Sequence, residues 1–126
     1  MGILLVVAVL LLSEKSPGLR DHFGIVYDPL RNKVVIHGGN SRDVDGKYNY
    51  VRDTWEWDTK SWVKKDTGTV PTRSSHLIVY DRYNDISVLF GGTLFPGVIH
   101  DDTWLWNGEH WRKAGVSGPS ARYSPG

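Results

Sequence analysis

The chain has 126 residues, 40% of them hydrophobic, and 15 Lys+Arg against 14 Asp+Glu give a formal net charge of +1. This length and composition suffice for one modest domain with a hydrophobic core, and because the sequence is neither low in complexity nor highly charged, disorder is not the default expectation. Because the sequence has no basic stripe and no cysteine, it predicts no nucleic-acid partner, no disulfide, no thiolate metal site and no cysteine nucleophile.

The chain begins with an apolar run, ILLVVAVLLL at residues 3–12. A helix of that length would rise about 15 Å, half of a bilayer, so no membrane span is predicted. The length suits the apolar core of a signal peptide, although no Lys or Arg precedes it and no typical cleavage site follows; a strand left from a preceding unit would read alike. Residues 1–16 are therefore interpreted as a signal-like or remnant hydrophobic segment, and the signal interpretation predicts a secreted or extracytoplasmic protein.

The remainder, residues 17–126, repeats itself. RDHFGIVYDPLRNKVVIHGG at 20–39 aligns with RSSHLIVYDRYNDISVLFGG at 73–92, 53 residues later. DTWEWDTKSW at 53–62 aligns with DTWLWNGEHW at 102–111, 49 residues later, and these two phrases hold all six tryptophans. One copy therefore spans about 20–66, the second about 73–114, and GPSARYSPG starts a third from residue 118.

Each copy predicts four short strands. HFGIVYD or SHLIVYD is followed by a polar turn, and KVVIH or ISVLF then ends at a glycine pair. In the third strand, DTWEW or DTWLW, period-two alternation places both tryptophans on one face; a short turn leads to the fourth, which carries the last tryptophan. No stretch has a sustained helical period. The sequence therefore predicts an all-β chain made of two four-stranded antiparallel units.

This combination resembles the kelch repeat, and among kelch repeats the galactose-oxidase-like propellers. The resemblance rests on the glycine pairs, the tryptophan phrases, and the Pro and Arg that open each unit. Its structural repeat residues are Gly38, Gly39, Asp53, Trp55, Trp57, Trp62, Gly91, Gly92, Asp102, Trp104, Trp106 and Trp111. The resemblance implies kelch-type β-propeller blades, two complete and a third begun. Because closed propellers have about four to eight blades, further blades must come from a longer chain or from a homo-oligomer.

The repeated residues are interpreted first as structural. The tryptophans could stack on carbohydrate, but their repeat spacing favours a core role, and Asp53 and Asp102 are expected to bind nearby turn backbone. Arg20, Arg73 and Arg122 likewise recur with the repeat. The histidines show no metal-ligand spacing, and the copper centre of galactose oxidase needs a Cys-modified Tyr that a Cys-free chain lacks. The sequence therefore predicts no metal, no cofactor and no catalytic residue.

The best candidate for binding is the loop NSRDVDGKYNYVR, residues 40–52, and within it Arg42, Tyr48, Tyr50 and Arg52. Tyr and Arg are enriched at interaction hot spots, and binding residues concentrate in loops on a rigid scaffold. Its counterpart TLFPGVIHD, residues 93–101, offers Phe95. A solvated variable loop is the alternative interpretation.

The functional prediction is a kelch-repeat interaction module that presents propeller loops to a protein or glycan partner. The alternative is a fragment of a longer kelch-like enzyme, a sugar-active isomerase or an oxidase-like protein, with its active site in other blades. A remainder of the reading frame with a Cys and Tyr and His ligands would favour the oxidase.

Overall fold

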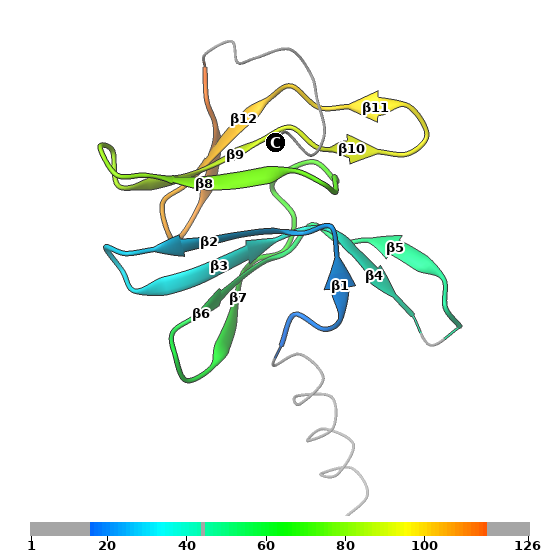
Figure 1. Ribbon diagram of the computed structural model, residues 1–126, viewed down its shortest axis with the longest axis horizontal. Coiled ribbons are helices and arrows are strands. Elements are labelled where there is room, and N and C mark those ends of the chain that lie inside the picture. The colour runs from blue at the N-terminus through cyan, green and yellow to red at the C-terminus, as the bar shows by residue number, and fades with distance from the viewer. Residues whose placement is uncertain (1–15, 44, 116–126) are drawn as a thin grey trace, which may run out of the picture.

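The computed structural model describes residues 16–43 and 45–115, and these residues form strands, turns and loops (Figure 1). The all-β prediction is therefore confirmed. No helix within these ranges is long and apolar enough to cross a membrane. The apolar run at residues 3–12, the third repeat from residue 118 and Arg122 lie outside the described residues.

Two four-stranded antiparallel sheets form the body of the structure. The first has the order β2-β3-β6-β7, with β2 at Gly24–Asp28, β3 at Lys33–His37, β6 at Thr54–Trp57 and β7 at Trp62–Asp66. The second has the order β8-β9-β12-β13 in space, with β8 at Leu77–Asp81, β9 at Ile86–Phe90, β12 at Thr103–Trp106 and β13 at Trp111–Lys113. Each sheet thus corresponds to one copy of the sequence repeat.

The turns at the β2–β3, β6–β7, β8–β9 and β12–β13 connections are each closed by a side chain. Asp28 accepts hydrogen bonds from the backbone N–H groups of Leu30 and Arg31 at 3.0 and 3.1 Å, and Asp58 acts alike between β6 and β7. Asp81 and Asn107 do the same in the second sheet. An Asp or Asn at the start of a turn replaces a backbone acceptor in this way, which is why these short sequences reverse the chain.

Two small hairpins, not predicted as strands, leave the same edge of the two sheets (Figure 1). The predicted irregular loop at 40–52 instead contains β4 (Asn40–Arg42) and β5 (Tyr48–Tyr50), and β4 also pairs with β1 (Arg20–Asp21). In the second copy β10 (Thr93–Leu94) pairs with β11 (Val98–Ile99). Six of the thirteen residues of the predicted loop therefore lie in strands, three in β4 and three in β5.

The face of the second sheet that carries the tryptophans packs against the first sheet. The indole N–H of Trp106 donates to Glu56 at 3.0 Å, and that of Trp111 donates to Thr54 at 2.8 Å. Glu56 is held in turn by Arg31, at 2.6 Å. The apolar cluster between these bonds comprises Val35, Val70, Ile78, Leu89, Trp106 and Trp111. Burial of this cluster is the main force that joins the two sheets.

A histidine pair completes the contact between the sheets. His37 is fully buried and lies 2.8 Å from the Thr54 hydroxyl through Nδ1, and His76 contacts the His37 carbonyl oxygen at 2.9 Å through Nε2. The two ring centroids are 5.5 Å apart. Burial lowers the pKa of His37 well below its usual value, and it lowers the pKa of His76 to about 4. Both rings are therefore neutral at pH 7.

The second glycine of each pair allows two chain segments to meet closely. Gly39 has φ +96°, and a Cβ there would lie 2.5 Å from the Asp21 carbonyl oxygen. Gly92 has φ +100°, and a Cβ there would lie 2.8 Å from the Ser74 carbonyl oxygen. A side chain is excluded at both positions by conformation and by space together.

We predict that Gly39→Ala lowers the free energy of unfolding by about 3 kcal/mol, because it combines a left-handed backbone with a clash against β1. Gly46→Ala is the matched control: Gly46 has φ +80°, but no heavy atom lies within 4 Å of the place that its Cβ would take, so only the backbone cost of about 1 kcal/mol applies. Urea unfolding of the two variants measures the difference. Equal losses would show that the close approach at Gly39 costs nothing.

We also predict that stability falls as pH drops from 6.5 toward about 4. The unfolded chain protonates both histidines in this window while the folded chain does not, so the contribution is complete above pH 6.5 and is lost below it. The shift of His76 alone corresponds to about 3 kcal/mol. Chemical unfolding across the window should show a flatter pH dependence for His76→Gln than for the wild-type chain. A wild-type profile that is flat down to pH 4 would contradict this.

Candidate functional site

The two small hairpins form one continuous surface. The Tyr50 hydroxyl accepts a hydrogen bond of 3.1 Å from the backbone N–H of Phe95, which joins β5 to the β10–β11 turn. We call the surface made by residues 19–21, 40–43, 45–50 and 93–99 the hairpin face. It lies at the edge of the sheets, beyond the contact that joins them (Figure 1).

An exposed arginine and tyrosine form the last strand pair before the turn of the β4–β5 hairpin. Arg42 and Tyr48 are opposite each other in the strand register, and the Arg42 guanidinium carbon lies 4.2 Å from the centroid of the Tyr48 ring. The guanidinium also donates a hydrogen bond to the Tyr48 hydroxyl. A stacked, hydrogen-bonded pair loses little side-chain freedom when a partner binds, which favours its use in recognition.

A hollow of about 360 Å³ lies beside this pair. Asp21 supplies an anionic group on its rim, because a hydrogen bond from His22 lowers the pKa of the Asp21 carboxyl. Arg42 supplies a cation on the same rim. The complete lining is Leu19, Arg20, Asp21, Asn40, Arg42, Asp43 and Tyr48. The hollow therefore offers charges of both signs next to an aromatic ring.

The second copy adds several apolar side chains to the hairpin face, beside Leu19 of the first copy. The Phe95 side chain is 74% exposed, and Val98 and Ile99 are also exposed. Tyr50, by contrast, is half-buried beneath the link to Phe95. The structure thus brings Phe95 together with the tyrosines and Arg42 of the first copy on one surface.

Arg52 does not join this surface. A Cβ at Gly68 would lie 2.5 Å from Arg52 Nε, so the side chain lies against the loop that follows β7. Conversely, the sequence did not single out Leu19, Asp21 and Asn40 as lining residues. They reach the hollow through the pairing of β1 with β4, in which Asp21 faces Asn40. β1 has two residues and pairs with β4, which lies much later in the sequence. The sequence around β1 therefore contains no local pattern that predicts this pairing.

The repeated Arg and Asp residues form a buried structural pair in each copy. Arg73 is 1% exposed; it donates to the Gly91 carbonyl oxygen at 3.1 Å and to the Asp102 carboxylate at 2.8 Å. The Trp104 indole N–H also donates to Asp102, at 2.8 Å. Arg20, Gly38, Asp53 and Trp55 repeat this arrangement. The expectation that these Asp side chains bind nearby turn backbone was therefore wrong, since their partners are a distant guanidinium and an indole.

This pairing leaves the carboxylates unsuited to proton transfer. Burial alone would raise the pKa of Asp102, but hydrogen bonds from Arg73 and Trp104 outweigh it and hold the pKa far below its usual range. The pKa of Asp53 is lowered for the same reasons. Within the described ranges, no group of three or more acidic and histidine side chains could hold a metal ion.

The tryptophans divide into two sets. Trp55, Trp106 and Trp111 are buried, and Trp57, Trp62 and Trp104 are half-buried. Trp57 and Trp62 lie against each other, with ring centroids 5.4 Å apart, on the open face of the first sheet. None of the six lies on the hairpin face.

No family model matches the chain, and no curated protein matches it. Among solved structures, the chain is similar to one described as "Structure of YjhT", with a TM-score of 0.60 and 16% sequence identity. The match covers 79% of this chain and 32% of that chain. The chain therefore spans about a third of the length of that neighbour, and the two share a fold over the matched part.

We predict that Asp102→Asn lowers the free energy of unfolding by about 3 kcal/mol, because it leaves the buried Arg73 guanidinium without its counter-charge. Asp101→Asn is the matched control at the adjacent, exposed position, and surface changes of this kind cost about 0.5 kcal/mol or less. Thermal or urea unfolding at neutral pH distinguishes the two. Equal stabilities would mean that the pair is dispensable for the fold.

Proposed function

We propose that the two sheets are consecutive blades of a kelch-type β-propeller and that the chain is an interaction module whose hairpin face binds a partner. The propeller interpretation is supported by two sheets of the same strand order that stack face to face, each built from one copy of the repeat. The likeness to YjhT supports a shared fold and says nothing about a ligand.

The binding role is carried by one observation: the Arg42–Tyr48 stack and the exposed Phe95 lie on two hairpins that the Tyr50–Phe95 hydrogen bond joins. Aromatic and arginine side chains on a rigid support are the composition of interaction hot spots. The hairpins are also positioned by sheets that need none of these side chains for their own packing. No observation on the described residues favours the enzyme alternative.

Of the two predicted partner classes, the geometry favours a protein over a glycan. β5 is the edge strand of its three-stranded sheet, and it lies next to the hollow that Arg42 and Tyr48 line. An extended peptide can pair with such an edge while one of its side chains enters a neighbouring pocket. The mixed charges on the rim would then select polar or charged side chains of the peptide.

We predict that peptides selected from a displayed library on the immobilised chain lose at least about tenfold in affinity for Tyr48→Ala and for Phe95→Ala. Tyr83→Ala is the control, since Tyr83 is 99% exposed in the β8–β9 turn, at the opposite edge of the sheets (Figure 1). Titration by calorimetry measures each affinity. Ligands that respond only to Tyr83→Ala would refute the hairpin face, and retention of glycans alone on an array would refute the protein partner.

A further inference from the structure

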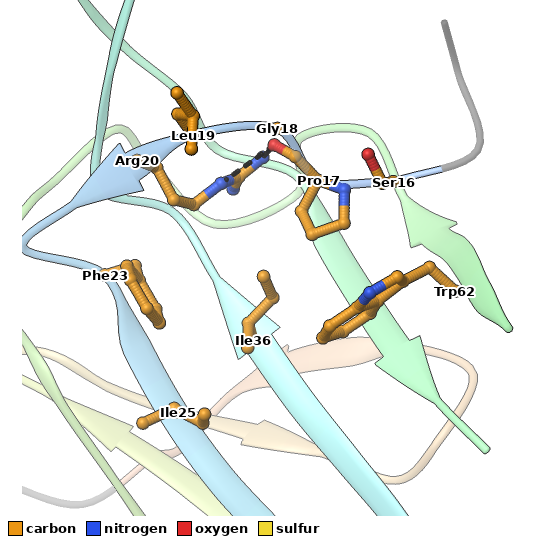
Figure 2. Close-up of a pocket in the computed structure, with 9 residues that line it drawn as sticks. All are labelled: Ser16, Pro17, Gly18, Leu19, Arg20, Phe23, Ile25, Ile36 and Trp62. Atoms are coloured by element: carbon orange, nitrogen blue, oxygen red, sulfur yellow. Dashed lines mark hydrogen bonds between the residues drawn. The ribbon is translucent and has the colours of Figure 1, made fainter. Parts of the chain in front are cut away.

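A hollow of about 580 Å³ lies on the open face of the first sheet (Figure 2). Ile25 from β2, Ile36 from β3 and Trp62 from β7 point into it together, and residues 16–20 form one wall. This is the tryptophan face of the first sheet, and Ile25 is 56% exposed there. An apolar hollow of this size in the middle of a sheet face is typical of a packing surface.

The same three positions in the second copy are buried core residues. The repeat places Ile78, Leu89 and Trp111 where the first copy has Ile25, Ile36 and Trp62, and all three belong to the cluster between the sheets. Val70, from the segment before Arg73, belongs to that cluster too, just as Pro17, before Arg20, lines the hollow. Within residues 16–43 and 45–115, the hollow is therefore the unfilled equivalent of a contact that the chain already makes once.

The structure also shows what fills such a hollow. In the internal contact, Val35 and Val26 of the first sheet pack against the cluster. Their repeat counterparts are Val88 and Val79, which lie on the outer face of the second sheet, where Val79 is 47% exposed. The chain thus carries two surfaces equivalent to those that meet between its sheets. One is the hollow on the first sheet, and the other is the outer face of the second sheet.

A polar contact is repeated as well. Trp111 donates its indole N–H to Thr54 inside the chain. The counterparts are Trp62, at the hollow, and Thr103, on the outer face of the second sheet. A second copy seated on the hollow can therefore supply Trp62 with the same type of acceptor.

Two sequence differences between the copies would make a contact between two chains differ from the sheet-to-sheet contact within one chain. Leu105 replaces Glu56, so the acceptor for the second indole is lost and the outer face becomes more apolar. Leu77 replaces Gly24, which lies against Ile78 so closely that a Cβ would come within 2.6 Å. The innermost strands of two copies must therefore lie farther apart than β2 and β8, and the contact between copies is weaker than the one within a chain.

We propose that the chain associates head to tail, with the outer face of the β8–β9–β12–β13 sheet of one copy seated in the hollow on the first sheet of another. This contact is heterologous, because it joins two different surfaces. In a closed ring of copies, every hollow and every outer face is then covered. Two, three or four copies with two sheets each would give about four to eight sheets, the number in closed propellers. The proposal depends on the sheet-to-sheet contact alone and not on any ligand of the hairpin face.

The test uses the 126-residue chain and two half-exposed positions, one on each surface. Ile25→Arg blocks the hollow and leaves the outer face intact, and Val79→Arg does the reverse. Tyr83→Arg, in an exposed turn outside both surfaces, is the matched control. Light scattering after size exclusion gives the mass of each species relative to the 14.2 kDa chain, and circular dichroism confirms that each variant keeps its β structure.

The wild type and Tyr83→Arg are expected to associate as concentration rises, to two, three or four chain masses. Each single arginine variant should remain a monomer, while an equal mixture of the two should form a dimer, because one intact hollow then meets one intact outer face. A monomeric wild type at every concentration tested would overturn the proposal. A dimer that survives in only one of the single variants would also overturn it, since this indicates a symmetric contact.

Discussion

Two buried indole N–H groups determine how the two sheets fit. Trp106 and Trp111 are the largest side chains of the apolar cluster at this contact, but each brings a donor that must find an acceptor away from water. Glu56 accepts one bond and requires Arg31 to compensate its charge; Arg31 in turn is held by Asp28 at 2.7 Å. Thr54 accepts the other and lies against His37. The charged and polar residues of the first sheet are thus a consequence of packing tryptophan against it.

This requirement explains two differences between the copies. Both copies keep the three tryptophans of the repeated phrase, because each presents the same face in the same direction. On the opposite face the valines and the threonine are also kept, but Glu56 and His37 meet the second sheet, whereas Leu105 and Phe90 occupy the equivalent positions on the outer face. The first sheet is adapted to a partner rich in indole donors. The outer face of the second sheet has Leu105 and Phe90 at these positions and so offers fewer hydrogen-bond acceptors.

The strands of the two sheets were predictable from the sequence because each carries its own local pattern. Alternation fixed the face of Trp55 and Trp57, and the offset between the copies fixed which residues are equivalent. The hairpins were not predictable, since strands of two or three residues have no periodicity to detect. The partners of Asp53 and Asp102 were also mistaken, because an Asp before a strand reads as a turn residue while its guanidinium partner lies about thirty residues earlier. Arg42, Tyr48 and Phe95 could be singled out as candidates for binding from their residue types. Their common surface was not, because the link from Tyr50 to the Phe95 backbone depends on how the sheets stack.

The hairpin face is therefore coupled to the core mainly through geometry, and Arg20 is a side chain that contributes to both. β4 and β5 continue from the first sheet and β10 and β11 from the second, so the stacking of the sheets sets the angle between the hairpins. The Tyr50–Phe95 bond then fixes their edges together. Such an arrangement allows the exposed side chains of the hairpins to change without cost to the tryptophan contact. A change in that contact, however, would move Phe95 relative to Arg42 and Tyr48 and so alter the surface that a partner meets.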